Sequence, residues 1–190
     1  AIRKAVHDAT GKYESVHFFM NDTIADFMAR KDAGKLLAVG ALSPDELVYA
    51  NGPPLWFEKC DVGKIATKLR SQINKGQKPA AAFLLKGVGL FVSADEKTAP
   101  IVNDIVASSF FIRTNAAVLG GVHVLTKRQA DFISNWEAET FRKQLVGSSS
   151  NGELKNRIAI ITGAGSGLGR SIAIGLARAG AMVAIADVDT

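Results

Sequence analysis

The chain has 190 residues, of which 47% are hydrophobic, so it holds apolar material for one medium-sized domain and part of a second. Its formal charge of +5 is spread without a block of like charges, which excludes a nucleic-acid-binding arm and a polybasic membrane anchor. The single cysteine, Cys60, excludes an internal disulfide framework and is expected to be a small buried hydrophobe. No stretch fits a transmembrane helix or a signal peptide, and the sequence therefore predicts a cytoplasmic protein.

Apolar periodicity predicts alternating helices and strands in the first part of the chain. The expected elements, in chain order, are a helix over 22–40, a strand over 46–50, a short strand over 55–57, a helix over 62–76 and a strand pair over 80–95. In the first helix Ile24, Phe27 and Met28 recur at helical spacing. Ser43-Pro44, just before the first strand, is also typical of a helix start or a turn.

A long helix is expected over 97–119, ending at Gly120-Gly121. Its near-continuous stripe consists of Ile101, Ile105, Ser108, Ile112 and Ala116. We therefore expect the side chains of Ile101, Ile105 and Ile112 to be buried. A last helix over 127–145 leads into a run of small polar residues.

That polar run, GSSSNGELKN, separates two apolar patterns of different character. The predicted organisation is α/β throughout: a first domain over 1–146, a linker over 147–156 and the start of a second domain over 157–190. In the second part, an apolar strand over 157–161 leads through a glycine-rich turn into a helix, and a second strand ends at Asp187.

The glycine-rich turn predicts a phosphate-binding site, because a helix N-terminus supplies backbone N–H groups and a positive dipole end. A side chain at Gly163 or Gly167 would block the tight turn or the approach of a pyrophosphate, and one at Gly169 would hold the helix away from the strand. Asp187 lies about 20 residues beyond the last glycine, where a carboxylate can accept hydrogen bonds from adenosine ribose hydroxyls.

The spacing of Thr162-Gly163, Gly167 and Gly169 resembles the Thr-Gly-x-x-x-Gly-x-Gly motif of the short-chain dehydrogenase/reductase family. The resemblance runs from about residue 154 to 190. It implies the first βαβ of a Rossmann fold that binds NAD, with NADP disfavoured. In the implied site Thr162 braces the loop, the pyrophosphate faces Ser166, Gly167, Leu168 and Gly169, and Asp187 determines the choice of cofactor.

The catalytic Ser and Tyr-x-x-x-Lys of that family would lie more than a hundred residues after the glycine motif. The two tyrosines, Tyr13 and Tyr49, precede the motif, and neither has a lysine four residues later. We therefore assign no catalytic residue to this chain and expect it to be a piece of a longer protein. Isolated His7, His17 and His123 lack metal-ligand spacing, so no metal site is assigned either and each is expected to be an ordinary surface or hydrogen-bonded core histidine.

A second resemblance covers residues 15 to 146. Three stretches, SPDELVYANGPPLWFE, KGVGLFVSADEKTAPIVNDI and AAVLGGVHVLTKRQADFISNWEAETFRKQL, are similar to parts of the class II aldolase/adducin-type domain. They are most similar to bifunctional proteins in which that domain precedes a short-chain dehydrogenase, a group that includes rhamnulose-phosphate aldolase fusions. Val88 stands where simple class II aldolases have a zinc-binding histidine. The resemblance therefore implies zinc only if a portion before Ala1 retains a site.

Three functions stay open at this point. The first is a fragment of an NAD-dependent oxidoreductase fused to a partial aldolase-like domain, acting on an alcohol of a sugar, polyol or hydroxy-aldehyde. The second is a metal-dependent carbon–carbon lyase, and the third is a non-catalytic, adducin-like assembly module. The expected partners are a small sugar-type substrate and further copies of the chain, with no nucleic acid and no membrane.

Overall fold

The structure is a computed structural model that describes residues 1–136 and 152–188. It is a mixed α/β protein that divides into two compact units, Ala1–Gly147 and Ser148–Thr190. No helix in the described ranges is both long and apolar enough to cross a membrane.

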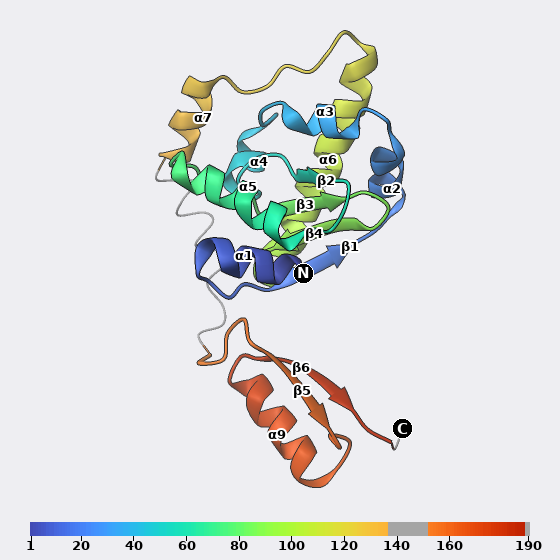
Figure 1. The fold of residues 1–190 in the computed structure, drawn as a ribbon, viewed down its shortest axis with the longest axis vertical. Helices are drawn as coiled ribbons and strands as arrows, with labels where there is room; N and C mark the ends of the chain where they lie inside the picture. Colours follow the sequence, from blue (N-terminus) through green and yellow to red (C-terminus); the bar gives the residue numbers. More distant parts are fainter. Residues whose placement is uncertain (137–151, 189–190) are drawn as a thin grey trace. The chain divides into compact units, whose positions relative to one another are not determined.

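A four-stranded sheet forms the centre of the N-terminal unit (Figure 1). Its strands, in spatial order, are β1 (Val16–Phe19), β4 (Gly89–Ser93), β3 (Ala82–Leu85) and β2 (Leu55–Phe57). β4 pairs antiparallel with both β1 and β3, whereas β2 pairs parallel with β3. The β3–β4 turn fits its sequence, because Gly87 has a φ of 71° and the Val88 N–H bonds to the Leu85 carbonyl at 3.0 Å. The predicted strands 55–57 and 80–95 are thus confirmed.

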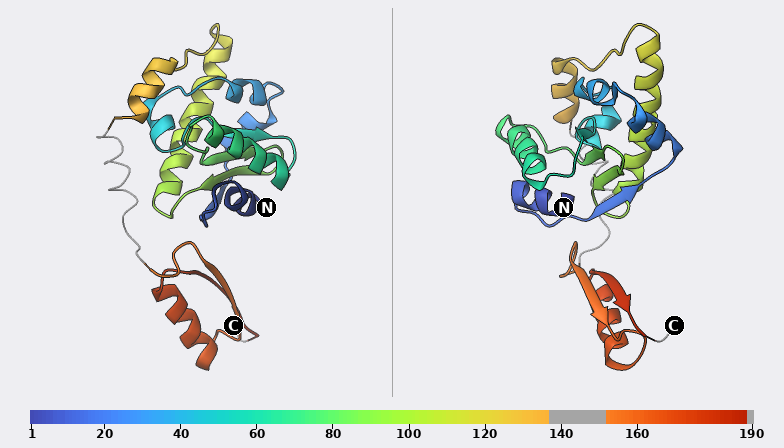
Figure 2. Two further views of the ribbon diagram at one scale, coloured as in Figure 1. Left: turned by 60° about the vertical axis from the view of Figure 1, so that its left-hand side comes forward. Right: turned by 45° about the vertical axis from the view of Figure 1, so that its right-hand side comes forward.

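Helices cover both faces of this sheet, as the two views of Figure 2 show. α1 (Ile2–Thr10) and α5 (Val62–Asn74) pack on one face, against Phe83 and Leu85 of β3. α2 (Asp22–Ala29) and α6 (Thr98–Val118) pack on the other, against Ala82 and Leu84. Alternate residues of β3 therefore face different helical layers, as expected for a strand that is buried on both sides.

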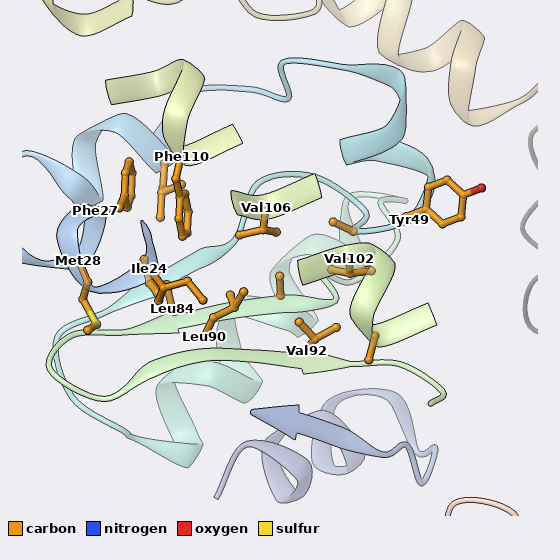
Figure 3. Packing of buried hydrophobic residues seen from close by; sticks show 14 of the residues in the cluster. Ile24, Phe27, Met28, Tyr49, Leu84, Leu90, Val92, Val102, Val106 and Phe110 are labelled. Atoms are coloured by element: carbon orange, nitrogen blue, oxygen red, sulfur yellow. The ribbon is translucent and has the colours of Figure 1, made fainter. Parts of the chain in front are cut away.

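The larger core lies between the sheet and α2 and α6 (Figure 3). The rings of Phe27 and Phe110 stack with centroids 4.1 Å apart and planes at 5°. Ile24 and Met28 lie beside them and are buried, which confirms the apolar face predicted for residues 22–29.

The long helix is confirmed, but its predicted buried face is wrong by one position. The buried residues of α6 are Thr98, Ala99, Val102, Val106, Ser109, Phe110 and Arg113. Ile101 and Ile105 are only partly buried at the margin of the core, and Ile112 is 48% exposed. α6 is apolar on several sides, so the position of its buried face depends on Phe27 and on Glu46, which lie far away in the sequence.

Two further predictions are corrected by local hydrogen bonding. The helix expected over 22–40 breaks at Arg30, whose ψ is 139° and whose guanidinium binds Asp32 at 2.8 and 2.9 Å, and α3 (Ala33–Ala38) follows. The strand expected over 46–50 is instead the short helix α4 (Pro44–Val48). Ser43 caps α4 by accepting the Glu46 N–H, so the helix-start alternative is the right one.

One further helix lies near the end of the described part of the N-terminal unit. α7 (Lys127–Ser134) begins with a capping box between Thr126 and Gln129. The helix predicted over 127–145 ends at Ser134 in the described part, with Asn135 as its C-cap residue. Residues 137–145 of that prediction, and residues 147–151 of the predicted linker, lie outside the described residues. Cys60 is exposed rather than buried, because it lies in the loop before α5.

The C-terminal unit is a strand, helix and strand. β5 (Ile158–Thr162) and β6 (Met182–Ala186) pair parallel, and α9 (Gly167–Arg178) packs against both. Gly180, with a φ of 93°, turns the chain from α9 back toward β6. The strands and helix expected in this part are present within a few residues of their predicted bounds.

Candidate functional site

The turn between β5 and α9 has the backbone conformation that its glycines allow. Gly163 and Gly167 have φ values of 67° and 54°, in the left-handed region that favours glycine. The Gly163 N–H donates to the Ala186 carbonyl at 2.8 Å and so ties the turn to the end of β6. A Cβ atom added at either glycine would meet open space, so conformation rather than crowding requires glycine there.

Gly169 is required for a different reason. A Cβ atom at this position would overlap the carbonyl group of Gly163. Glycine therefore lets the first turn of α9 approach the end of β5 closely, which agrees with the expectation that a larger residue would separate helix and strand. The three motif glycines thus shape one short segment.

The residues at the N-terminus of α9, 166–168, are exposed to solvent. Ser166 is the N-cap residue, but its side chain makes no capping hydrogen bond. Leu168, one residue into the helix, is 83% exposed. A helix start without a side-chain cap can offer its first backbone N–H groups, together with the positive end of its dipole, to an anion.

Asp187 brings the end of β6 into the same site. Its Oδ2 accepts the Gly165 N–H at 2.6 Å, and its Oδ1 accepts the Val188 N–H at 2.7 Å. The predicted cofactor-binding positions Gly163, Ser166, Gly167, Leu168, Gly169 and Asp187 all lie in this unit. The carboxylate touches the turn through Gly165, which sequence reasoning did not single out. The available signal was a further glycine inside the motif, at a position that the motif leaves free.

The residues considered for a metal lie in the N-terminal unit. His7 is on α1, His17 on β1 and His123 in the segment after α6, while Val88 in the β3–β4 turn is 45% exposed. Within residues 1–136 and 152–188, no three His, Cys, Asp or Glu side chains form a group that could hold a metal ion. The Nε2 atom of His17 is buried without a partner, contrary to the expectation of a hydrogen-bonded core histidine.

A buried polar cluster joins α4 to α6. Arg113 donates to both carboxylate oxygens of Glu46 at 3.2 Å, and Ser109 donates to Glu46 at 2.7 Å. Arg113 also donates to the carbonyls of Leu36 and Gly40, and both charged side chains are almost fully buried. These hydrogen bonds satisfy the cluster from within, so it ties helices together rather than presenting a reactive group.

Two ion pairs in loops of the N-terminal unit shift the pKa values of their members. The hydrogen bond from Arg30 holds the pKa of Asp32 below its ordinary value, and the pKa of Arg30 is raised by the same bond. Hydrogen bonds from Lys86 and then from Trp56 lower the pKa of Glu58. The Lys86–Glu58 pair is exposed and the Arg30–Asp32 pair is half-buried, and both lie in loops, where they fix local geometry.

No protein-family model and no curated protein matches the chain. Among solved structures, it is similar to an aldolase II superfamily protein from Pseudomonas syringae, with a TM-score of 0.41 and 14% sequence identity. The similarity covers 75% of this chain and 57% of that one, so the chain spans a little over half the length of its structural neighbour. The similarity to this aldolase II superfamily protein is weak.

Proposed function

We propose that the C-terminal unit is the nucleotide-binding beginning of an NAD-dependent short-chain dehydrogenase. The whole protein would then oxidise an alcohol group of a sugar, polyol or hydroxy-aldehyde. The observation that carries the proposal is the meeting of a glycine-rich turn with a carboxylate at the end of the next parallel strand, where Gly165 N and Asp187 Oδ2 lie 2.6 Å apart. A sugar-type substrate, a cytoplasmic location and assembly with further copies of the chain belong to the same proposal.

The residues of the turn fit the pyrophosphate of a dinucleotide. Positive φ values at Gly163 and Gly167 bend the chain so that backbone rather than side chains lines the turn. Backbone N–H groups at Ser166, Gly167, Leu168 and Gly169 would then hold the phosphates at the start of α9. NAD, when bound, supplies the hydride acceptor, and this chain's residues supply binding and orientation.

Asp187 accounts for a preference between the two nicotinamide cofactors. Its carboxylate would accept hydrogen bonds from the adenosine ribose hydroxyls of NAD. NADP carries a phosphate on one of those hydroxyls, and that phosphate would meet the carboxylate as a like charge. Arg170 is the cation closest in sequence to the glycine turn, but it is exposed on the first turn of α9. We therefore expect NAD to bind more tightly than NADP.

The N-terminal unit supports a second candidate, a class II aldolase-type or adducin-like role. In the described residues, the sequence stretches similar to that domain contain α4, β2, β4, the two ends of α6 and α7. Val88, at the turn where a zinc-binding histidine is expected, has no metal-binding atom. An aldol-cleavage assay of the full-length protein, with and without EDTA, distinguishes the candidates. Cleavage that EDTA abolishes indicates a lyase, whereas no cleavage favours the dehydrogenase or the assembly module.

Calorimetric titration with NAD and NADP tests the primary proposal. We expect NAD to bind more tightly to the wild-type chain, and Asp187→Ser to weaken NAD while shifting the preference toward NADP. Asp26→Ser is the matched control, because Asp26 is an exposed aspartate on α2 of the other unit. NADP binding that equals or exceeds NAD binding in the wild type would remove Asp187 from the ribose site.

A further inference from the structure

We propose that Gly165 is a positioning residue that fixes the cofactor preference of the turn by holding the Asp187 carboxylate. This inference rests on the proposed function, because it assigns a role in NAD binding to a residue at a position that the glycine motif leaves free. Two observations on the contact between Gly165 and Asp187 support it. The Gly165 N–H donates to Asp187 Oδ2 at 2.6 Å, and a Cβ atom at residue 165 would lie 2.9 Å from the same oxygen.

The first observation defines the direction of the carboxylate. The Gly165 N–H donates to Asp187 Oδ2 and the Val188 N–H donates to Asp187 Oδ1. A carboxylate has about four lone-pair sites, so it can accept from backbone donors and from a ribose hydroxyl together. The side chain of Asp187 is thereby oriented before a ligand arrives, which lowers the entropic cost of binding.

The second observation shows what a side chain at this position would do. Gly165 is not among the residues with positive φ, so its backbone conformation is open to other residues. An added Cβ would also lie 3.0 Å from Asp187 Cγ and 3.3 Å from Asp187 Cβ, so the Asp187 side chain would have to shift. A methyl group at this position must therefore push the carboxylate away from the turn.

Gly165→Ala is accordingly expected to change the choice of cofactor rather than phosphate binding. The displaced carboxylate loses its alignment with the ribose hydroxyls of NAD, and it also repels the additional phosphate of NADP less strongly. We expect the ratio of NADP Kd to NAD Kd to fall about tenfold, the size of one charge-assisted hydrogen bond. Gly175→Ala is the matched control, because Gly175 lies within α9 and an added Cβ there has nothing within 4 Å.

The test is a set of titrations of the full-length protein with NAD and NADP. The variants are Gly165→Ala, Gly175→Ala, Asp187→Asn and the double variant Gly165→Ala/Asp187→Asn. If Gly165 acts through Asp187, Gly165→Ala changes the preference strongly in the wild-type background and little in the Asp187→Asn background. Gly175→Ala leaves the preference unchanged.

The outcomes separate this inference from the proposed function. Full-length wild-type protein that binds neither cofactor overturns the proposed function, and the positioning role with it. Wild-type chain that prefers NAD, combined with a Gly165→Ala variant of unchanged preference, overturns the positioning role alone. A Gly165→Ala variant that weakens NAD and NADP equally, in both backgrounds, shows general damage to the turn and also overturns it.

Discussion

At the residue scale, the most constrained side chains of the N-terminal unit are Glu46 and Arg113. They come from helices and lie 67 positions apart in the sequence, and both are almost fully buried. Neither residue could be recognised from the sequence as a buried, paired charge. Glu46 stands in an apolar run that resembles a strand, and Arg113 follows Ile112, which the helical pattern assigns to the core. Their pairing depends on the packing of α4 against α6.

Removal of one partner leaves the other charge buried and unpaired. We therefore expect Glu46→Ala to lower the free energy of unfolding of this unit by about 3–5 kcal/mol. Urea unfolding followed by tryptophan fluorescence measures this unit, because Trp56 and Trp136 both belong to it. Asp32→Ala, which breaks the half-buried pair with Arg30, is the control and should cost much less. Equal losses for the two variants would contradict the account.

At the element scale, α6 shows why the existence of a helix is predictable and its orientation is not. Its length and its end follow from local signals, and the structure places it at Thr98–Val118. The buried side includes Phe110, which stacks on Phe27 of α2, while Phe111 and Ile112 are 68% and 48% exposed. A helix that is apolar on several sides does not specify its own core face.

Two substitutions close together on α6 test this orientation. Phe110→Ala should destabilise the N-terminal unit by about 3–5 kcal/mol, because it opens a cavity beside Phe27. Ile112→Ala should change the free energy of unfolding by about 0.5 kcal/mol or less, since its side chain is largely in solvent. Thermal or urea unfolding of both variants measures the difference. A larger loss of stability for Ile112→Ala than for Phe110→Ala would mean that α6 buries the face predicted from the sequence.

The candidate site was more predictable than the fold around it. Strand, glycine turn, helix and acidic strand end are consecutive in the sequence, so Gly163, Gly167, Gly169 and Asp187 could be identified together. The contact of Gly165 with Asp187 joins residues 22 positions apart and depends on the geometry of the turn. The strand expected over 46–50 is part of the short helix α4 instead, because a short run with four apolar residues fits either a strand or a helix.

At the scale of the whole molecule, the two units differ in how well they cover their apolar residues. In the N-terminal unit every residue of β3 is buried. In the C-terminal unit, Ile160 of β5 and Ile185 of β6 are 76% and 66% exposed, and Leu168 of α9 is 83% exposed. Parallel strands are normally covered on both faces, so this unit has little burial to oppose local opening.

The hydrogen-exchange rates of backbone amides in the intact chain should therefore differ between the two units. We expect amides in β5 and β6 to exchange faster than those in β3 and β4, because opening the smaller unit exposes less buried apolar surface to water. Exchange measured by NMR at several pH values gives the opening free energy for each strand. Equal protection in the two sheets would mean that the apolar residues of the C-terminal unit are covered in solution.

The most direct test of the central claim is an NMR titration of the isotope-labelled chain with NAD. The claim is that the turn after β5 and the end of β6 form one dinucleotide site. It predicts that saturable shifts on adding NAD concentrate at the amides of residues 163–169 and 187, with the sheet of the N-terminal unit unaffected. NADP should produce weaker shifts at the same amides. Shifts that are absent from the turn, or that centre on the N-terminal unit, would contradict the claim.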